Sequence, residues 1–334
     1  MRRFLLPENG QFYKANLHCH TTVSDGKMTP EEVKERYLGE GYSIVAFTDH
    51  CVLIPHPELK DERFLPLNGV EIEVVNCGTE PAQRKKHNHI CYVALEEDNV
   101  TMPFLSPGCI WGNAKQYVDR IKYDPAHAEF KRRFEPENIN EMIRLGREAD
   151  FFVTYNHPVW SQEYYEDYIH YQGMNAMEIL NYGSYHAGFD EYNGRIYDDL
   201  LLAGKRIYCI ATDDNHSLAD TCGGWTMIKA DRLEYRMITK AMEDGHFYAS
   251  TGPEIHALWW EDGVVHVECS EASKIICHIG PFRPYFERAK DTPLTEADFE
   301  IRKEDVYFRI TVVDEQGRKA DTNAYFTDEL FEMN

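Results

Sequence analysis

From Lys14 to about Ser250, short apolar runs alternate with amphipathic segments. The apolar runs predict seven β-strands, at Ala15–His18, Ser43–Thr48, Val70–Val75, His89–Leu95, Phe151–Tyr155, Ala176–Leu180 and Ile207–Ala211. Apolar residues at helical spacing lie between several of these runs and predict helices that begin near Pro30 and Pro136 and that span Tyr192–Ala203 and Leu233–Met242. Because alternating strands and helices form parallel sheets, we expect an α/β fold with enough repeated units to close into a barrel.

Two segments depart from this alternation. Residues 98–134 are rich in aromatic residues, proline and glycine, and we expect an insertion over one face of the barrel. After residue 250 the pattern becomes one of strands joined by turns, at Ile255–Trp260, Val264–Cys269, Lys274–Ile279 and Tyr307–Val313. The sequence therefore predicts two domains, a barrel over residues 1–250 and a small antiparallel β module over residues 251–334.

The charge balance limits the classes of binding partner that we expect. The chain has 35 basic and 57 acidic residues and a net charge of −22, which disfavours binding to nucleic acid and to anionic membranes. The apolar run Phe4–Leu6 is too short for the core of a signal peptide. The nine cysteines form no CxxC pair, so reduced thiols in a cytoplasmic protein are expected. The oligomeric state stays open.

Histidines and carboxylates recur where the predicted strands end. Each has an ordinary explanation when taken alone: a solvated strand-end histidine, a turn for Asp25, or a helix cap for Asp49. Carboxylates such as Glu71 and Glu73, two apart in an apolar run, are costly to bury unless they are paired or bind metal. The set predicts a multinuclear site for Mn, Fe or Zn. Its candidate members are His18, His20, Asp25, Asp49, His50, Glu71, Glu73, His87, His89, His157, Asp214 and His216.

These residues lie in ordered motifs that resemble those of the PHP (polymerase and histidinol phosphatase) superfamily. The motifs are HCHTTVSDG, FTDH, GVEIE, NHICYVAL, YNHPV and TDDNH, and the resemblance spans about residues 14–250. It implies a distorted (β/α)7 barrel with two or three divalent metal ions. It also implies hydrolysis of a small phosphorylated substrate.

The resemblance also implies a ligand set for each ion. His18, His20, Glu71 and Asp214 would hold the first ion, and Glu71 would bridge to a second held by His89 and His157. The third would take His50, His216 and Asp25, where many members have a histidine instead. His89 is chosen over His87 because the family histidine precedes a small apolar strand.

Motifs beyond the barrel leave the substrate class open. The runs GWTMIKADRL, AMEDGHFYASTGPEI and YFRITVVDEQGRKADTNAYF resemble a PHP branch that carries a C-terminal β module and includes an aryl carbamate hydrolase. We expect a phosphoesterase, with a carbamate or ester hydrolase and a non-catalytic metal-binding module as the alternatives.

In either hydrolase, a hydroxide bridging two metal ions would attack the substrate, with Glu71, Asp214 and Asp49 as the catalytic residues. Arg84 and Lys85 are candidates for steering a phosphate, although a basic turn is usually just solvated. Trp160 and Trp111 either wall the substrate pocket or pack on the barrel rim.

Overall fold

The computed structural model describes residues 2–76, 85–281 and 283–331. Its centre is a large mixed sheet in which nine strands follow the order β10-β9-β8-β5-β4-β3-β2-β11-β12. Their bounds are β2 (Gln11–Asn16), β3 (Ile44–Phe47), β4 (Leu65–Val75), β5 (His87–Ala94), β8 (Phe151–Tyr155), β9 (Ala176–Asn181), β10 (Tyr208–Thr212), β11 (Trp225–Ala230) and β12 (Phe247–Ser250). Each of the seven strands predicted here overlaps an observed strand, although β2 begins and ends earlier than the predicted Ala15–His18. No strand was expected at β11 or β12.

The sheet curls so that β10 comes to lie beside β11, but it does not close into the expected barrel. Among the described residues, no backbone ladder joins these two strands. Instead, the Thr226 hydroxyl accepts a hydrogen bond from the Ala211 N–H at 3.3 Å and donates one to the Ala211 carbonyl at 3.0 Å. A side chain thus occupies the position that a closing ladder would need.

One inner strand runs against the expected direction. β5 pairs antiparallel with both β4 and β8, whereas β2–β3, β3–β4, β8–β9 and β9–β10 are parallel pairs. Only residues 76–86 separate β4 from β5. A parallel connection needs about a dozen residues or more, so this segment favours an antiparallel return.

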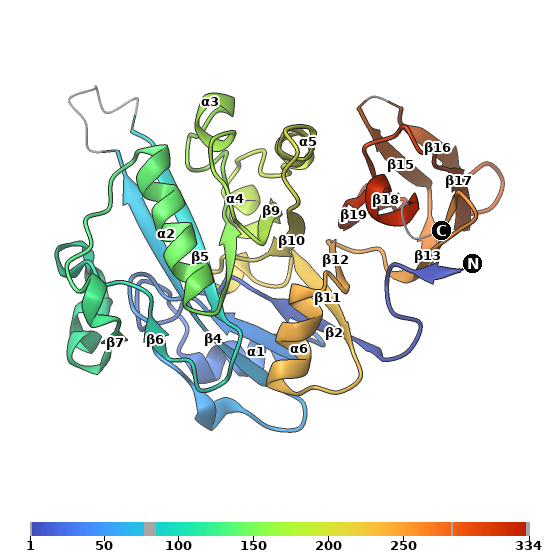
Figure 1. Cartoon of the computed structure of the whole chain (residues 1–334). Helices are drawn as coiled ribbons and strands as arrows, with labels where there is room; N and C mark the ends of the chain where they lie inside the picture. The colour runs from blue at the N-terminus through green and yellow to red at the C-terminus, as the bar shows by residue number, and fades with distance from the viewer. Residues whose placement is uncertain (1, 77–84, 282, 332–334) are drawn as a thin grey trace.

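The four predicted helices correspond to α1, α2, α5 and α6, whereas α3, α4 and α7 were not predicted. Figure 1 shows α2 and α6 packed on the sheet. A capping box fixes the start of the first helix, because Thr29 and Glu32 each accept a backbone N–H of the other. α2 buries Ile139, Met142 and Ile143. The helices are α1 (Pro30–Gly39), α2 (Pro136–Glu148), α3 (Tyr165–Tyr168), α4 (Tyr182–His186), α5 (Gly194–Leu202), α6 (Tyr235–Glu243) and α7 (Thr327–Phe331).

The C-terminal strands continue the large sheet and also build a second one. β12 pairs antiparallel with β19, which connects to β18, β15 and β16, while β1, β13, β14 and β17 form a separate four-stranded sheet. Figure 1 shows these strands gathered at one end of the molecule. Their bounds are β1 (Arg3–Phe4), β13 (Ile255–Glu261), β14 (Val264–Ala272), β15 (Lys274–Gly280), β16 (Tyr285–Arg288), β17 (Leu294–Glu300), β18 (Tyr307–Val313), β19 (Lys319–Thr322) and β20 (Tyr325–Phe326). The division into two domains at residue 250 stays a prediction.

A buried arginine ties the two parts of the chain together. Arg309 of β18 is 2% exposed, and its guanidinium forms two 2.9 Å hydrogen bonds to the carboxylate of Asp198 in α5. It also lies 3.4 Å from Asp321 of β19. One fully enclosed cation therefore links a helix of the first part to two strands of the second.

Residues 98–134 form short elements rather than a regular βα unit: β6 (Thr101–Met102), β7 (Lys122–Tyr123) and three 3₁₀ helices, Pro107–Cys109, Gly112–Arg120 and Pro125–His127. The eight cysteines that the structure describes are all free thiols. None of the helices in the described residues combines the length and the hydropathy that a membrane span requires.

Candidate metal centre

The predicted ligands meet at one end of the parallel strands. His18 and His20 follow β2, beyond the point where the strand ends, and Cys19 between them bridges to Asn215. His157 and Asp214 both have positive φ, 26° and 50°, in the turns that follow β8 and β10. Strained turns of this kind persist where the surrounding structure enforces them, and they concentrate at functional sites. The backbone is thus shaped to aim these side chains inward.

Glu71 is the centre of the cluster. Its buried carboxylate has five imidazole nitrogens 3.0–3.3 Å away, from His18, His20, His50, His89 and His157. Asp214 forms a second centre, with its Oδ1 3.2 Å from His18 Nε2 and 3.0 Å from His20 Nε2. Carboxylates and imidazoles converge here as the resemblance implied.

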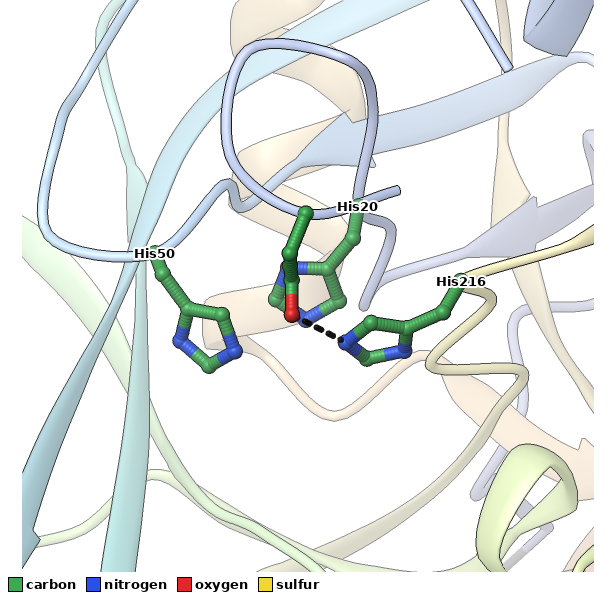
Figure 2. A group of neighbouring side chains, drawn as sticks. His20, His50 and His216 are labelled. Carbon is green, nitrogen blue, oxygen red and sulfur yellow. Dashed lines mark ion pairs between the residues drawn. The ribbon is translucent and has the colours of Figure 1, made fainter. Parts of the chain in front are cut away.

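The nine predicted ligands all belong to clusters whose donor atoms lie within 4.8 Å of one another. These clusters are His18–His20–Asp214, His18–Glu71–His157, His50–Glu71–His89 and His20–Asp25–His50–His216. They overlap the three ligand sets expected from the resemblance, but the groupings differ: His157 clusters with His18, His89 clusters with His50, and His20 also joins the third group. Figure 2 shows His20, His50 and His216 facing a common point. Asp25 belongs to the same cluster, and its Oδ2 lies 3.4 Å from Nε2 of His216.

The donor atoms fit divalent metal ions. His50 Nδ1, Glu71 Oε2, His89 Nε2 and Asp214 Oδ1 are buried and make no hydrogen bond in the described structure. His18 Nε2 and His20 Nε2 lie 3.1 Å apart. Buried polar atoms without partners are costly, and a cation satisfies several of them at once. Imidazole and carboxylate donors without a thiolate suit Mn, Fe or Zn.

Burial and opposite charge together set the ionisation of the cluster. Burial disfavours a charged His20, but the facing carboxylates of Asp214 and Glu71 prevail and raise its pKa to about 10. Burial also opposes the charge of Glu71, yet the facing histidines, His18 first among them, hold its pKa well below the ordinary value. For His50, burial and the neighbouring His20 both lower the pKa well below the usual range. Glu71 therefore stays ionised and can serve cations.

Glu178, which sequence reasoning missed, holds two of the ligands in place. Its fully buried carboxylate lies 2.7 Å from His18 Nδ1 and accepts the backbone N–H of His157 at 2.8 Å. Thr212 and Asn181 donate to the same carboxylate. The signal was available, because Glu178 is a lone acid in the apolar run AMEILN.

Two other carboxylates hold the loops around the site. Glu191 accepts the backbone N–H groups of Val159 and Trp160 at 3.1 and 2.7 Å. Asp213 accepts three backbone N–H groups from residues 222–224 and the hydroxyl of Tyr37. Burial raises the pKa of Asp213 to about 6 in spite of these bonds. Asp213 adjoins Asp214 in TDDNH, but its role depends on a distant loop that no local pattern reveals.

Asp49 does not join the converging ligands. Its Oδ1 accepts the N–H of Thr21 and both the N–H and the hydroxyl of Ser24, and its Oδ2 accepts the hydroxyl of Thr21. These bonds hold the loop that carries Asp25. Asp49 therefore positions this loop, and its contacts do not support the catalytic role that was expected for it.

A cavity of about 390 Å³ opens over the clusters. Trp111, from residues 98–134, lies in its wall and donates its indole N–H to Glu73 at 2.5 Å. Trp160 lies in the wall as well, with its ring 5.0–5.3 Å from those of His87, His89 and His157. Of the two alternatives for these tryptophans, the pocket wall therefore matches their position.

The basic residues expected near the phosphate do not reach the described wall of the cavity. Lys85 is exposed and is not among the lining residues, and Arg84 lies outside the described residues. His87 does line the cavity, and burial together with the charge of His89 lowers its pKa to about 4. His87 also forms a cluster with Glu73 and His89.

Comparison with known proteins gives a family and distant structural neighbours. The family model of the PHP domain matches residues 16–215. A two-domain protein from Bacteroides vulgatus, containing a predicted PHP-like metal-dependent phosphoesterase, is 13% identical, with 96% of this chain and 98% of that chain covered and a TM-score of 0.45.

Two further solved structures each have a TM-score of 0.39. An amidohydrolase from Chromobacterium violaceum, solved with sulfate and no metal, is 17% identical over 61% of this chain and 88% of its own. A lesion-specific endonuclease from Pyrococcus furiosus is 14% identical over 70% of this chain and 56% of its own. No curated protein matches the sequence.

Proposed function

The match over residues 16–215 shows that the chain belongs to the PHP domain family, and we propose that it is a metal-dependent hydrolase whose substrate is a small phosphoester. The observation that carries the proposal is the set of buried donor atoms around Glu71 that have no hydrogen-bond partner. Two or three Mn, Fe or Zn ions fit these donors. When bound, such ions polarise the scissile group, neutralise charge that develops on its oxygens and make water acidic enough to attack near neutral pH.

The protein's own residues orient and confine this chemistry. Glu71 and Asp214 supply the negative charge between the histidines, and Glu178 fixes the ring orientation of His18. Trp111 and Trp160 wall the cavity and exclude water from its sides. We assign the direct catalytic roles to Glu71 and Asp214, and we assign Asp49 to holding the loop of Asp25.

One observation favours a second candidate, the hydrolysis of a carbamate or a neutral ester. The described lining of the cavity contains five carboxylates and no lysine or arginine. A phosphate dianion would then depend on the metal ions alone for its neutralisation, whereas a neutral ester would need no cationic side chain. We prefer phosphoesters because the resemblance to the PHP family implies them and because several bound cations can offset the negative charge of a phosphate.

A screen with one chromophore separates the candidates. The full-length protein, loaded with Mn, Fe or Zn, would be assayed on 4-nitrophenyl phosphate, bis(4-nitrophenyl) phosphate and 4-nitrophenyl N-methylcarbamate. We expect one of the phosphoesters to be the best substrate, with activity lost on chelation and restored by metal. Best turnover of the carbamate would overturn the phosphoester, and turnover of none would favour a non-catalytic module.

The same screen can test nucleic acid as a substrate. The acidic net charge disfavours only non-specific binding, so the expectation that nucleic acid is not a partner stays a prediction. A short oligonucleotide assayed beside the small esters tests it. Cleavage that depends on the added metal would reverse that expectation while keeping the hydrolase.

A further inference from the structure

A second cavity, of about 500 Å³, lies beside the metal pocket and takes no part in the chemistry above. It is bounded by the end of β9, helix α4, the end of β12 and the turn that leads into β19. β12 and β19 are hydrogen-bonded neighbours, and Figure 1 shows them where the large sheet passes into the C-terminal strands. Its size is that of a small-molecule site.

Helix α4 separates the two cavities. Gly183, Ser184 and Ala187 line the metal pocket, whereas Tyr182 and Tyr185 line the second cavity. Gly223 allows the ring of Tyr182 to lie close, because a Cβ there would meet that ring at 2.2 Å. The second cavity is therefore a distinct chamber that shares one short wall with the metal site.

Aromatic rings and two cations give this chamber its chemistry. Tyr182, Tyr185 and Tyr192 line it together with Leu180. Arg318 and Lys319 contribute positive charge, and Asp190 and Asp321 contribute negative charge. Arg318 is already engaged, since its Nε lies 2.7 Å from Asp314. The metal pocket, by contrast, has no lysine or arginine in its described lining.

The ammonium group of Lys319 is the feature that indicates a ligand. Its Nζ lies 3.3 Å from the centre of the Tyr192 ring, and no ion pair or hydrogen bond to that ammonium occurs among the described residues. The nearby carboxylate of Asp321 is occupied by Arg309, Thr311 and the hydroxyl of Tyr192. Burial lowers the pKa of Lys319, as expected for an ammonium with incomplete solvation. An ammonium offers three donors, and among the described residues none of them is hydrogen-bonded to the Asp190 and Asp321 carboxylates that line the same cavity.

We propose that this second cavity binds a small organic anion that carries a planar ring, with the anionic group on Lys319 and the ring among Tyr182, Tyr185 and Tyr192. The proposal is independent of the hydrolytic reaction, because none of these residues lines the metal pocket. A ring between tyrosines gains apolar burial and favourable ring contacts. An anion on Lys319 supplies the acceptor that the protein itself does not.

The probe is benzenesulfonate, whose sulfonate oxygens are weak ligands for divalent metals. Binding to the metal-loaded, full-length protein would be measured by calorimetry. Methanesulfonate, which has the anionic group without the ring, and benzyl alcohol, which has the ring without the charge, would be measured beside it. We expect benzenesulfonate to bind more tightly than either. Lys319→Met should weaken binding by about tenfold, the loss expected of one charge-assisted hydrogen bond. Lys290→Met, at an exposed lysine, is the matched control and should change nothing.

Two further variants locate the site. Tyr185→Ala, at a ring that is 52% exposed and thus safe to remove, should reduce the preference for benzenesulfonate over methanesulfonate. Glu71→Gln should leave binding intact, because it alters only the metal pocket. Absence of binding in the millimolar range, equal binding by Lys319→Met, or loss of binding in Glu71→Gln would each overturn the proposal.

Discussion

His18 Nδ1 lies 2.7 Å from Oε1 of Glu178, and both side chains are buried. This contact directs Nδ1 of His18 toward Glu178, so Nε2 is the ring nitrogen that faces Asp214 and Glu71. A carboxylate behind a ligating histidine fixes the ring and increases its basicity. Glu178 is thus a positioning residue for the metal centre.

Glu178→Gln should weaken metal binding without abolishing the fold. We expect a loss of about 10–100-fold in affinity for the added ion, as for other carboxylates behind metal-bound histidines. Competition with a chromophoric chelator measures the affinity, and Glu254→Gln, at an exposed acid, is the control. Unchanged affinity in Glu178→Gln would remove Glu178 from the metal centre.

Glu71→Gln should be more damaging than any single histidine variant, because five imidazoles face this one carboxylate. We expect activity to fall by more than about 100-fold, or ~2.7 kcal/mol of barrier, together with a lower metal content by elemental analysis. His266→Ala lies outside the site, where its ring pairs with Asp298, and should retain full activity. Activity of Glu71→Gln within about tenfold of the wild type, less than ~1.4 kcal/mol, would refute a bridging role.

We expect the protonation of Glu163 to make the stability of the fold depend on pH. Burial raises its pKa to about 8, although Tyr171, Tyr155 and Asn88 donate hydrogen bonds to it. The folded protein then holds a proton that the unfolded chain releases near pH 4.5, the ordinary value. Stability from this group is present below that pH and is lost as the pH rises toward 8, with a slope of up to about 1.4 kcal/mol per pH unit.

Urea unfolding of the wild type and Glu163→Gln at several values between pH 5 and 8 tests this assignment. The variant should lose less stability over this interval than the wild type. Glu166→Gln, at an exposed residue three positions further on, should follow the wild type. Parallel stability curves for the wild type and Glu163→Gln would show that Glu163 is ionised throughout.

Arg309→Met should destabilise the whole chain. The variant keeps a long apolar side chain but leaves the carboxylates of Asp198 and Asp321 without their shared cation. Breaking a buried pair from one side costs about 3–5 kcal/mol, which thermal unfolding would register. Arg302→Met, at an exposed arginine, provides the comparison. A melting temperature equal to that of Arg302→Met would show that Asp198 and Asp321 are not held by this arginine.

Local pattern and motif order were sufficient for much of the architecture and for the ligand positions. β8 has the predicted bounds, and α2 begins at Pro136 because a proline in the first turn and apolar residues at helical spacing are local properties. The antiparallel course of β5 and the failure of β10 to pair with β11 depend on connections and side chains distant in sequence.

The same distinction applies to the site. His18 and Asp214 are found in motifs, whereas Glu191 acts on Trp160 from another element, 31 residues away. For Asp49 the motif predicted a catalytic residue, but its hydrogen bonds come from Thr21 and Ser24 in a nearby loop. A motif fixes which residue is present, and only the packed structure decides where its side chain points.

The pairing of β12 with β19 leaves β12 with a neighbour on each side, since β11 covers its other edge. A chain cut at residue 250 would expose the backbone groups of Tyr248–Ser250 as a bare edge strand. Uncovered edges of this kind template pairing with other copies and promote aggregation. The C-terminal strands therefore also act as a cover that keeps the catalytic sheet from self-association, so solubility of the first part should depend on the second.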